Sequence, residues 1–132
     1  MKTFRELTVW QEAHKLVLAI YRVTTEFPSH ERYGLVSQMR RASVSTAANI
    51  VEGHKRRSQK EFLNFLDVAD SSLEEVKYYL LLSEDLVYLV PAVVASLYRQ
   101  ADLVGRMLNR FKKHVRQGVL HVQPARTVPA NA

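Results

Sequence analysis

The sequence predicts an all-α protein, an antiparallel up-down-up-down four-helix bundle. Apolar residues recur at alternating steps of three and four along most of the chain, which places them on one side of a helix. Only four glycines and four prolines occur in 132 residues, fewer than the many turns of a β protein require. Four helices are expected, at 8–26, 29–53, 58–87 and 91–117. Because the links between them are short, each helix must fold back along the one before it.

The first two helices are each predicted from one apolar stripe. The first stripe consists of Trp10, Ala13, Val17, Ile20, Thr24 and Phe27. This helix should stop at Pro28, which cannot continue it. The second stripe consists of Leu35, Met39, Ala42, Thr46 and Ile50. We expect the second helix to begin near Ser29 and to end at Gly53, since glycine is common just past a helix end.

The third and fourth helices carry start signals as well as stripes. Ser58 and Glu61 have the spacing of a capping box, in which each side chain satisfies a free backbone N–H at a helix start. The stripe that follows consists of Phe62, Leu66, Ala69, Leu73, Val76, Leu80, Ser83 and Val87. Pro91 suits the first turn of the fourth helix. The fourth stripe consists of Val94, Leu97, Ala101, Val104, Leu108, Phe111 and Val115.

The remaining sequence sets the organisation and class of the protein. Residues 118–132 show no periodicity, and we expect a mobile C-terminal tail there. No cysteine is present, which excludes disulfides, thiolate metal sites and cysteine nucleophiles. The apolar run from Leu16 to Tyr21 is cut off by Arg22, so it is too short for a signal peptide or a membrane span. We therefore expect a cytoplasmic protein of one domain, without a membrane partner.

Charge is distributed unevenly along the chain, whose formal net charge is +6. Residues 1–60 contain 11 Lys and Arg against 5 Asp and Glu, residues 61–90 contain 1 against 7, and residues 91–132 contain 7 against 1. An acidic third helix thus lies between two basic segments. Such segments can pair with each other inside the fold or act together on a charged partner.

The carboxylates of the third helix form a strip with two open interpretations. The strip consists of Asp67, Asp70, Glu74 and Glu75. These side chains could hold a hard cation or perform acid–base chemistry. Alternatively, they pair with arginines of the second helix or of a neighbouring subunit. We favour the pairing.

Other signs of catalysis or metal binding are absent from the sequence. No Asp or Glu precedes a histidine by three residues, and no two histidines have the H-x-x-x-H spacing of a zinc helix. Glycine loops that cradle phosphate and G-x-S-x-G elbows are missing as well. We therefore expect no enzyme, no metal and no cofactor.

The bundle topology gathers positive charge at one end, which we call the basic pole. The start of the first helix, the link between the second and third helices, and the end of the fourth must all lie there. The link and the fourth helix contribute Lys55, Arg56, Arg57, Lys60, Arg110, Lys112, Lys113 and Arg116, and the first residues add Lys2 and Arg5. These eight side chains of the link and the fourth helix are our candidate contacts to nucleic acid.

Two uses of the basic pole compete. Cations near helix C-termini offset the helix dipole, but one or two per helix suffice, each contributing about 0.3–1 kcal/mol. The surplus favours contact with phosphates of RNA or DNA, which is largely independent of base sequence and weakens with salt. No aromatic stacking motif accompanies the cluster in the sequence, so we expect no base readout.

The second helix also carries a polar seam. Arg41, Ser45, Asn49 and Glu52 follow steps of four, four and three, with Arg40 beside them. Such a seam can set the register of a helix pair or a subunit pair, or it can receive a ligand. We favour the structural role. Apolar residues also exceed what one bundle core needs, which predicts a homo-oligomer.

Several fragments of the sequence together resemble a known family. They are Phe4–Ala13, Phe27-Pro28, Tyr33-Gly34-Leu35, Gln38-x-Arg40-Arg41-Ala42, Asn49-Ile50-x-Glu52-Gly53 and Phe62-Leu63-x-Phe65-Leu66. In this order and spacing they resemble the four-helix bundle proteins encoded by intervening sequences in bacterial 23S ribosomal RNA genes. The resemblance extends from Phe4 to Phe111.

The resemblance implies a homo-oligomer, a pentameric ring, with no catalytic activity. That family is also similar in fold to the accessory variability proteins of diversity-generating retroelements, basic pentamers that bind nucleic acid and partner a reverse transcriptase. Our first hypothesis is therefore a non-enzymatic oligomer that associates with RNA or DNA through the basic pole. The alternative is a protein-interaction or scaffold subunit, for example one accessory to a reverse transcriptase.

Overall fold

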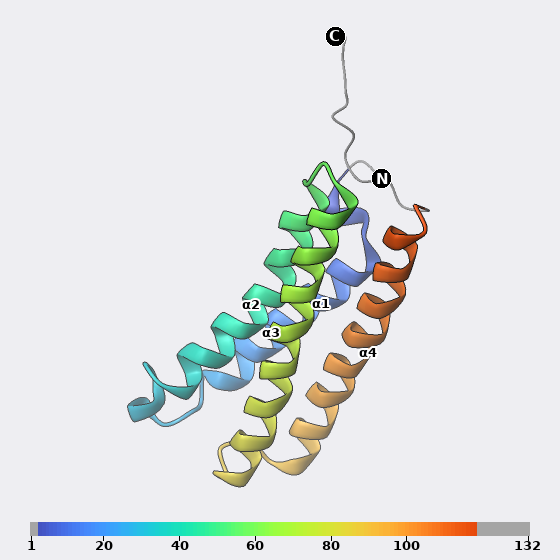
Figure 1. Cartoon of the computed structure of the whole chain (residues 1–132). Helices are drawn as coiled ribbons and strands as arrows, with labels where there is room; N and C mark the ends of the chain where they lie inside the picture. Colours follow the sequence, from blue (N-terminus) through green and yellow to red (C-terminus); the bar gives the residue numbers. More distant parts are fainter. Residues whose placement is uncertain (1–2, 119–132) are drawn as a thin grey trace.

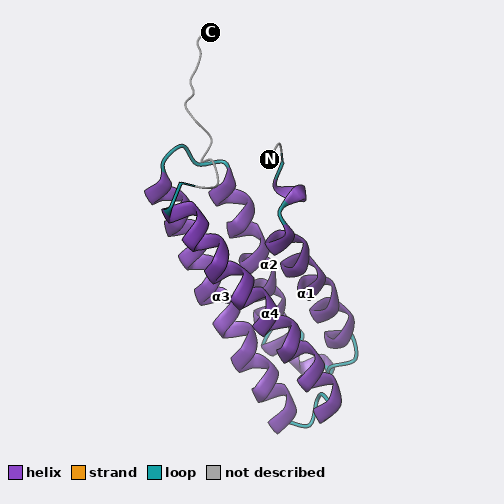
Figure 2. Ribbon diagram, turned by 90° about the vertical axis from the view of Figure 1, so that its right-hand side faces the viewer, coloured by secondary structure: helices purple, strands orange, loops and turns teal. Residues whose placement is uncertain are grey.

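The computed structural model describes residues 3–118 as a bundle of four long helices (Figure 1). The elements are η1 (Phe4–Glu6), α1 (Thr8–Thr24), η2 (Ser29–Glu31), α2 (Leu35–His54), α3 (Gln59–Asp85) and α4 (Pro91–Arg116). The chain reverses at each link, and both views show the helices side by side (Figure 2). Within residues 3–118, α1 packs on α2 and α4, and α3 packs on the same two, whereas no Cα atoms of the diagonal pairs lie within 8 Å of each other. The predicted all-α up-down-up-down bundle is confirmed.

The core follows the predicted stripes with one shift. Both the α2 and α4 stripes are buried throughout, and so is the α3 stripe apart from Val87. On α1, Val9 and Leu16 are buried, whereas the predicted Trp10 and Val17 are half-buried. Both α1 sets have helical spacing, and only the packing of α1 between α2 and α4 selects one of them.

The second helix begins later than predicted. Residues Ser29–Glu31 form the short helix η2, and α2 starts at Leu35 rather than at Ser29. One carboxylate oxygen of Glu31 accepts the Leu35 N–H at 3.1 Å, and the other accepts the Tyr88 hydroxyl at 2.9 Å. A side chain that satisfies a free N–H at the start of α2 therefore fixes the boundary.

The prediction that the second helix ends at Gly53 is wrong. Helix α2 continues through His54, and the positive φ typical of a terminating glycine occurs among glycines of residues 3–118 only at Gly118. A Cβ at position 53 would lie 2.9 Å from Cδ1 of Phe62 and 3.0 Å from Cβ of Phe65. Gly53 is thus required for the close approach of α2 and α3 at the basic pole.

The ends of α3 match the sequence in part. The Ser58 hydroxyl accepts the Glu61 N–H at 3.0 Å, which is the serine half of the predicted capping box. At the other end, α3 stops at Asp85 rather than at Val87, which adopts a left-handed φ of 64°. The Val87 N–H donates to the Glu84 carbonyl and the Tyr88 N–H to the Ser83 carbonyl, both at 2.9 Å. These bonds form a Schellman motif with a β-branched residue where glycine is usual.

The fourth helix and the flanking segments complete the described chain. Pro91 is the first residue of α4, as predicted. The predicted tail at 118–132 lies outside the described residues, apart from Gly118, and so does Lys2. Over residues 3–118 the helices are too polar or too short to cross a bilayer.

Candidate nucleic-acid interface

The basic pole is formed by the segments that the topology requires. Figure 1 shows the start of α1, the α2–α3 link and the end of α4 at the same end of the bundle. A hydrogen bond from the Gln59 side-chain amide to the Val115 carbonyl joins the start of α3 to the end of α4. The cations of the α2–α3 link therefore lie beside those of α4.

The structure does not support our prediction that Lys112 contacts phosphate. Only 9% of its side chain is exposed, because its stem packs between α4 and α3. Its ammonium lies 3.2 Å from Oδ1 of Asp67 and 3.1 Å from Oδ2 of Asp70. Two carboxylates thus neutralise this cation inside the fold, and we remove Lys112 from the candidate surface.

The Arg56 side chain also has partners within the protein. Its Nη2 lies 2.8 Å from Oε1 of Glu52, one turn earlier in the chain. Its guanidinium carbon lies 4.5 Å from the ring centroid of Phe65, within the range of a cation–π contact. Arg56 therefore holds the α2–α3 link against α3.

Six of the predicted cations remain on the surface of the basic pole. They are Lys55, Arg57, Lys60, Arg110, Lys113 and Arg116, and all six are exposed. None of these side chains forms a hydrogen bond or an ion pair with any residue between 3 and 118. Arg110, Lys113 and Arg116 are spaced three apart, so they lie along one face of α4. We call these six side chains the exposed cations.

Few acidic groups oppose the exposed cations. Glu52 is already paired with Arg56, and Asp67 and Asp70 are paired with Lys112. Glu6 and Glu61 add two exposed carboxylates at the same end. The electrostatic potential of this surface is therefore positive, and a nearby polyanion would be attracted to it.

His54 is a buried neutral group at the basic pole. Burial lowers the pKa of its imidazole, and the neighbouring Lys55 lowers it further, against a smaller opposing effect of Glu6. Its ring stands edge-on to Phe62, at 6.4 Å between centroids. His54 therefore belongs to the packing beneath the surface.

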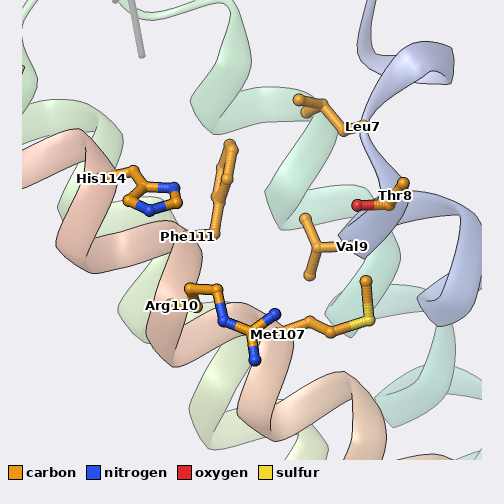
Figure 3. A pocket seen from close by; sticks show the side chains of 7 residues that line it. All are labelled: Leu7, Thr8, Val9, Met107, Arg110, Phe111 and His114. Carbon is orange, nitrogen blue, oxygen red and sulfur yellow. The ribbon is translucent and has the colours of Figure 1, made fainter. Parts of the chain in front are cut away.

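A hollow opens between the start of α1 and the end of α4, beside the exposed cations. It has a volume of about 160 Å³ and is lined by Leu7, Thr8, Val9, Met107, Arg110, Phe111 and His114. Figure 3 shows the Phe111 ring between His114 on one side and Leu7 and Val9 on the other. We predicted Phe111 only as a core residue and did not expect it beside a hollow at the surface. Its closeness to Arg110 was visible, but the apolar wall from the start of α1 was not.

The polar seam of α2 contacts one neighbouring helix, α3. Nη2 of Arg41 lies 3.2 Å from Oε1 of Glu75, and the hydroxyls of Ser45 and Ser72 lie 2.8 Å apart, so both tie α2 to α3. The Asn49 side-chain amide donates to the Ser45 carbonyl at 2.8 Å, within α2 itself.

Arg40 does not belong to the seam. Its Nε donates to the Thr24 hydroxyl at 3.0 Å, and its guanidinium carbon lies 4.5 Å from the centroid of the Tyr21 ring. One residue along a helix turns the side chain by about 100°, which directs Arg40 to α1 and Arg41 to α3.

The carboxylate strip of α3 is occupied by cations of the protein. Glu75 pairs with Arg41, as our preferred interpretation expected for the second helix. Asp67 and Asp70 instead pair with Lys112 of α4, and Glu74 lies 3.7 Å from Lys77. In the described chain no group of three or more His, Asp or Glu side chains is arranged to hold a metal ion.

Comparisons with known proteins identify the family. The model of the 23S rRNA-intervening sequence protein family matches residues 5–110. A crystal structure of a protein of unknown function from the S23 ribosomal protein family of Bacteroides thetaiotaomicron is similar in fold, with a TM-score of 0.75 and 20% sequence identity. The likeness covers 80% of this chain and 96% of that chain. A search of curated proteins found no match. Because the family model spans most of the chain and agrees with the resemblance noted above, the protein belongs to the 23S rRNA-intervening sequence protein family.

Proposed function

We propose that the protein is a non-enzymatic, homo-oligomeric protein of the cytoplasm that binds RNA or DNA through phosphate contacts at the basic pole. One observation carries the proposal. The six exposed cations converge at one end of the bundle without a partner among residues 3–118. Lysine and arginine side chains in this arrangement bind phosphates with little regard to base sequence.

Compensation of helix dipoles accounts for only part of this charge. Helices α2 and α4 end at the basic pole, and one or two cations per helix offset their dipoles. Lys55 fulfils that role for α2, and Arg116 for α4. Arg57, Lys60, Arg110 and Lys113 exceed the requirement, and they repel one another when no anion is bound.

Assembly into a homo-oligomer is supported by apolar side chains outside the core. Exposed apolar residues occur on three helices, namely Leu18, Tyr21, Val44, Val68, Tyr78 and Leu81. Patches of this kind mark protein interfaces more often than bare surface. The pentameric ring implied by the family resemblance would multiply the number of basic poles in one particle. Light scattering coupled to size exclusion measures the subunit count, and a monomeric mass at micromolar concentration would exclude the oligomer.

The binding test compares charge reversal at the two ends of the bundle. We expect Lys55→Glu, Arg57→Glu and Lys60→Glu together to weaken binding to every RNA and DNA sequence alike, because the lost contacts are to phosphates. Each lost contact should also reduce the slope of log K against log salt by about 1. The matched control reverses the exposed arginines Arg22, Arg32 and Arg99, which lie away from the basic pole. Equal losses in the two triple variants, or no binding by the natural chain at low salt, would refute the proposal.

Two adjacent lysines of α4 provide a finer test. Lys113 is exposed, whereas Lys112 is buried against Asp67 and Asp70. We expect Lys113→Gln to weaken nucleic-acid binding and to leave thermal stability unchanged. Lys112→Gln should do the reverse, lowering stability without reducing the salt dependence of binding. Fluorescence anisotropy and thermal unfolding of both variants measure the two effects separately.

A further inference from the structure

We propose that the hollow between α1 and α4 receives one unpaired base of a single-stranded nucleic acid. This inference rests on the proposed function, because the exposed cations would hold the backbone while the base enters. Arg110 belongs both to the exposed cations and to the lining of the hollow, so it joins the two surfaces. A strand bound at the basic pole would therefore pass directly over the opening.

The walls of the hollow suit a flat, uncharged ring. Leu7, Val9, Met107 and Phe111 line the hollow, and Phe111, which is 9% exposed, contributes the part of its ring that the core leaves uncovered. A base can pack against such apolar and aromatic walls irrespective of its identity, since every base has a flat π-face. A phosphate would lose its hydration against these apolar walls, whereas at the rim it can pair with Arg110 and stay in water. The chemistry of the walls thus selects the base and leaves the phosphate outside.

The rim of the hollow offers polar groups on both of its helices. Thr8 contributes a hydroxyl from α1, and Arg110 and His114 contribute a guanidinium and an imidazole from α4. Figure 3 shows the His114 ring beside the Phe111 ring. These groups can bond the edge of a base or the adjoining sugar and phosphate.

The size of the hollow limits what can enter. Its volume is about 160 Å³, whereas sites for whole small-molecule ligands measure roughly 300–1,000 Å³. A single ring system fits these dimensions, and a complete nucleotide does not. In a duplex each base is stacked and paired, and extruding one costs a few kcal/mol. The hollow therefore favours single strands over duplexes, and it does so without reading a particular base.

The test uses the full-length chain and two hollows of the same helix pair. Thr8→Leu fills the hollow at the basic pole with a side chain that cannot stack as an aromatic ring does. A second hollow between α1 and α4 is lined by Ala19, Arg22, Val23, Ala92, Val93, Ser96 and Leu97. Ser96→Leu places a leucine in that second hollow and serves as the control, because Ser96 precedes Arg110 by about 20 Å of helix. Circular dichroism verifies that both variants keep their helices.

Three oligonucleotides are compared by fluorescence anisotropy at one moderate salt concentration. They are a 12-nucleotide single strand, the same strand with abasic sites, and the corresponding duplex, each prepared as RNA and as DNA. We expect the natural chain to bind the intact strand at least about fivefold more tightly than the abasic strand, the lower bound for one stacked base. Thr8→Leu should lose that preference and keep its affinity for the duplex. Ser96→Leu should behave as the natural chain does.

The outcomes separate this inference from the proposed function. If the natural chain binds intact and abasic strands equally, with salt-dependent affinity, the hollow takes no base and the phosphate contacts stand. If the Thr8→Leu and Ser96→Leu variants retain the same preference for the intact strand, another surface stacks the base and the inference is wrong. If the natural chain binds none of the oligonucleotides at low salt, both proposals fail together. The abasic comparison needs no variant, so a misfolded Thr8→Leu chain would not prevent the test.

Discussion

The two ends of the bundle differ in whether the polar side chains named below have partners within the protein. At the basic pole, Arg57, Lys60 and Lys113 are exposed and have no partner among residues 3–118. At the opposite end, which we call the far pole, the α1–α2 and α3–α4 links bond to each other. There the Tyr88 hydroxyl donates to Glu31, and the Tyr88 ring lies 5.2 Å from that of Phe27.

This difference separates groups that hold the fold from groups that are free to act on a partner. Glu31 accepts a hydrogen bond from Tyr88 and another from the Leu35 N–H, and these bonds lower the pKa of its carboxyl, the Leu35 bond most. Lys112 resembles these paired groups although it lies at the basic pole, since Asp67 and Asp70 satisfy it. Position at an end of the bundle is therefore a weaker guide to function than the presence of an internal partner.

The largest expected effect comes from removing the partners of Lys112. Asp67→Asn combined with Asp70→Asn leaves a buried ammonium without a carboxylate, and breaking a buried pair costs about 3–5 kcal/mol. The two carboxylates are 64% and 41% exposed, so water screens part of the interaction. We expect the free energy of unfolding to fall by about 2–3 kcal/mol in urea titrations.

A control for this double variant exists on the same pair of helices. Asp102 lies 2.9 Å from Lys77, which also has Glu74 at 3.7 Å. Asp102→Asn should cost less than about 1 kcal/mol, because Lys77 keeps a second carboxylate. If the Asp67 and Asp70 double variant lowered the free energy of unfolding no more than this control, Lys112 would not depend on its two partners. Lys112 would then again be a candidate for contact with phosphate.

The next effect concerns the close packing that supports the basic pole. A Cβ at Gly53 would lie 2.9 Å from a ring atom of Phe62, which is fully buried and cannot move aside easily. We expect Gly53→Ala to lower the free energy of unfolding by about 1–2 kcal/mol, despite the better helix propensity of alanine. Thermal unfolding measures the change.

Gly105 of α4 provides the opposite case. A Cβ there would lie 3.5 Å from Cδ2 of Leu73, an ordinary contact. Gly105→Ala should therefore raise stability by up to about 1 kcal/mol, since alanine replaces glycine inside a helix. Stabilisation by both alanines would show that the α2 and α3 backbones need no glycine where they meet.

Gly53 and Lys112 also mark the limit of prediction from the sequence. Stripe spacing located the four helices and nearly all of the core, because periodicity reports which face of a helix is buried. Periodicity could not show which neighbouring helix packs against each side of the buried face. Lys112 follows Phe111 by about 100° of rotation, and only the packing of α4 on α3 brings it to Asp67 and Asp70.

The hollow beside the basic pole was beyond sequence analysis for the same reason. Phe111 was correctly predicted as a core residue from its place in the α4 stripe. Leu7 and Val9 come from the opposite end of the chain, and their meeting with Phe111 depends on the rotation of α1. The sequence placed Val9 outside the α1 stripe, so it did not predict this wall.

At the far pole, Val87 is expected to give a smaller effect of opposite sign. Its φ of 64° costs a β-branched residue about 1–2 kcal/mol, and its side chain is 86% exposed and makes little compensating contact. We expect Val87→Gly to raise the free energy of unfolding by about 1 kcal/mol. Leu86 directly precedes Val87, is also exposed, and has an ordinary φ of −81°. Leu86→Gly should lower stability, because glycine loses more backbone freedom on folding, and a gain from both substitutions would show that strain at Val87 is not the cause.

The smallest expected effect is the pH dependence contributed by His54. Its ordinary pKa is 6.5, and burial is the largest cause that lowers this pKa in the folded protein, with a smaller contribution from the nearby Lys55. Between the lowered pKa and 6.5 the unfolded chain binds a proton that the folded chain does not, so stability falls as the pH drops below 6.5. His54→Gln removes this contribution. The difference in urea midpoint between pH 7.5 and pH 5.5 should therefore be smaller in the variant than in the natural chain. If the variant and the natural chain showed the same difference in urea midpoint, folding would not shift the pKa of His54. Its imidazole would then be in contact with water and would belong to the surface of the basic pole.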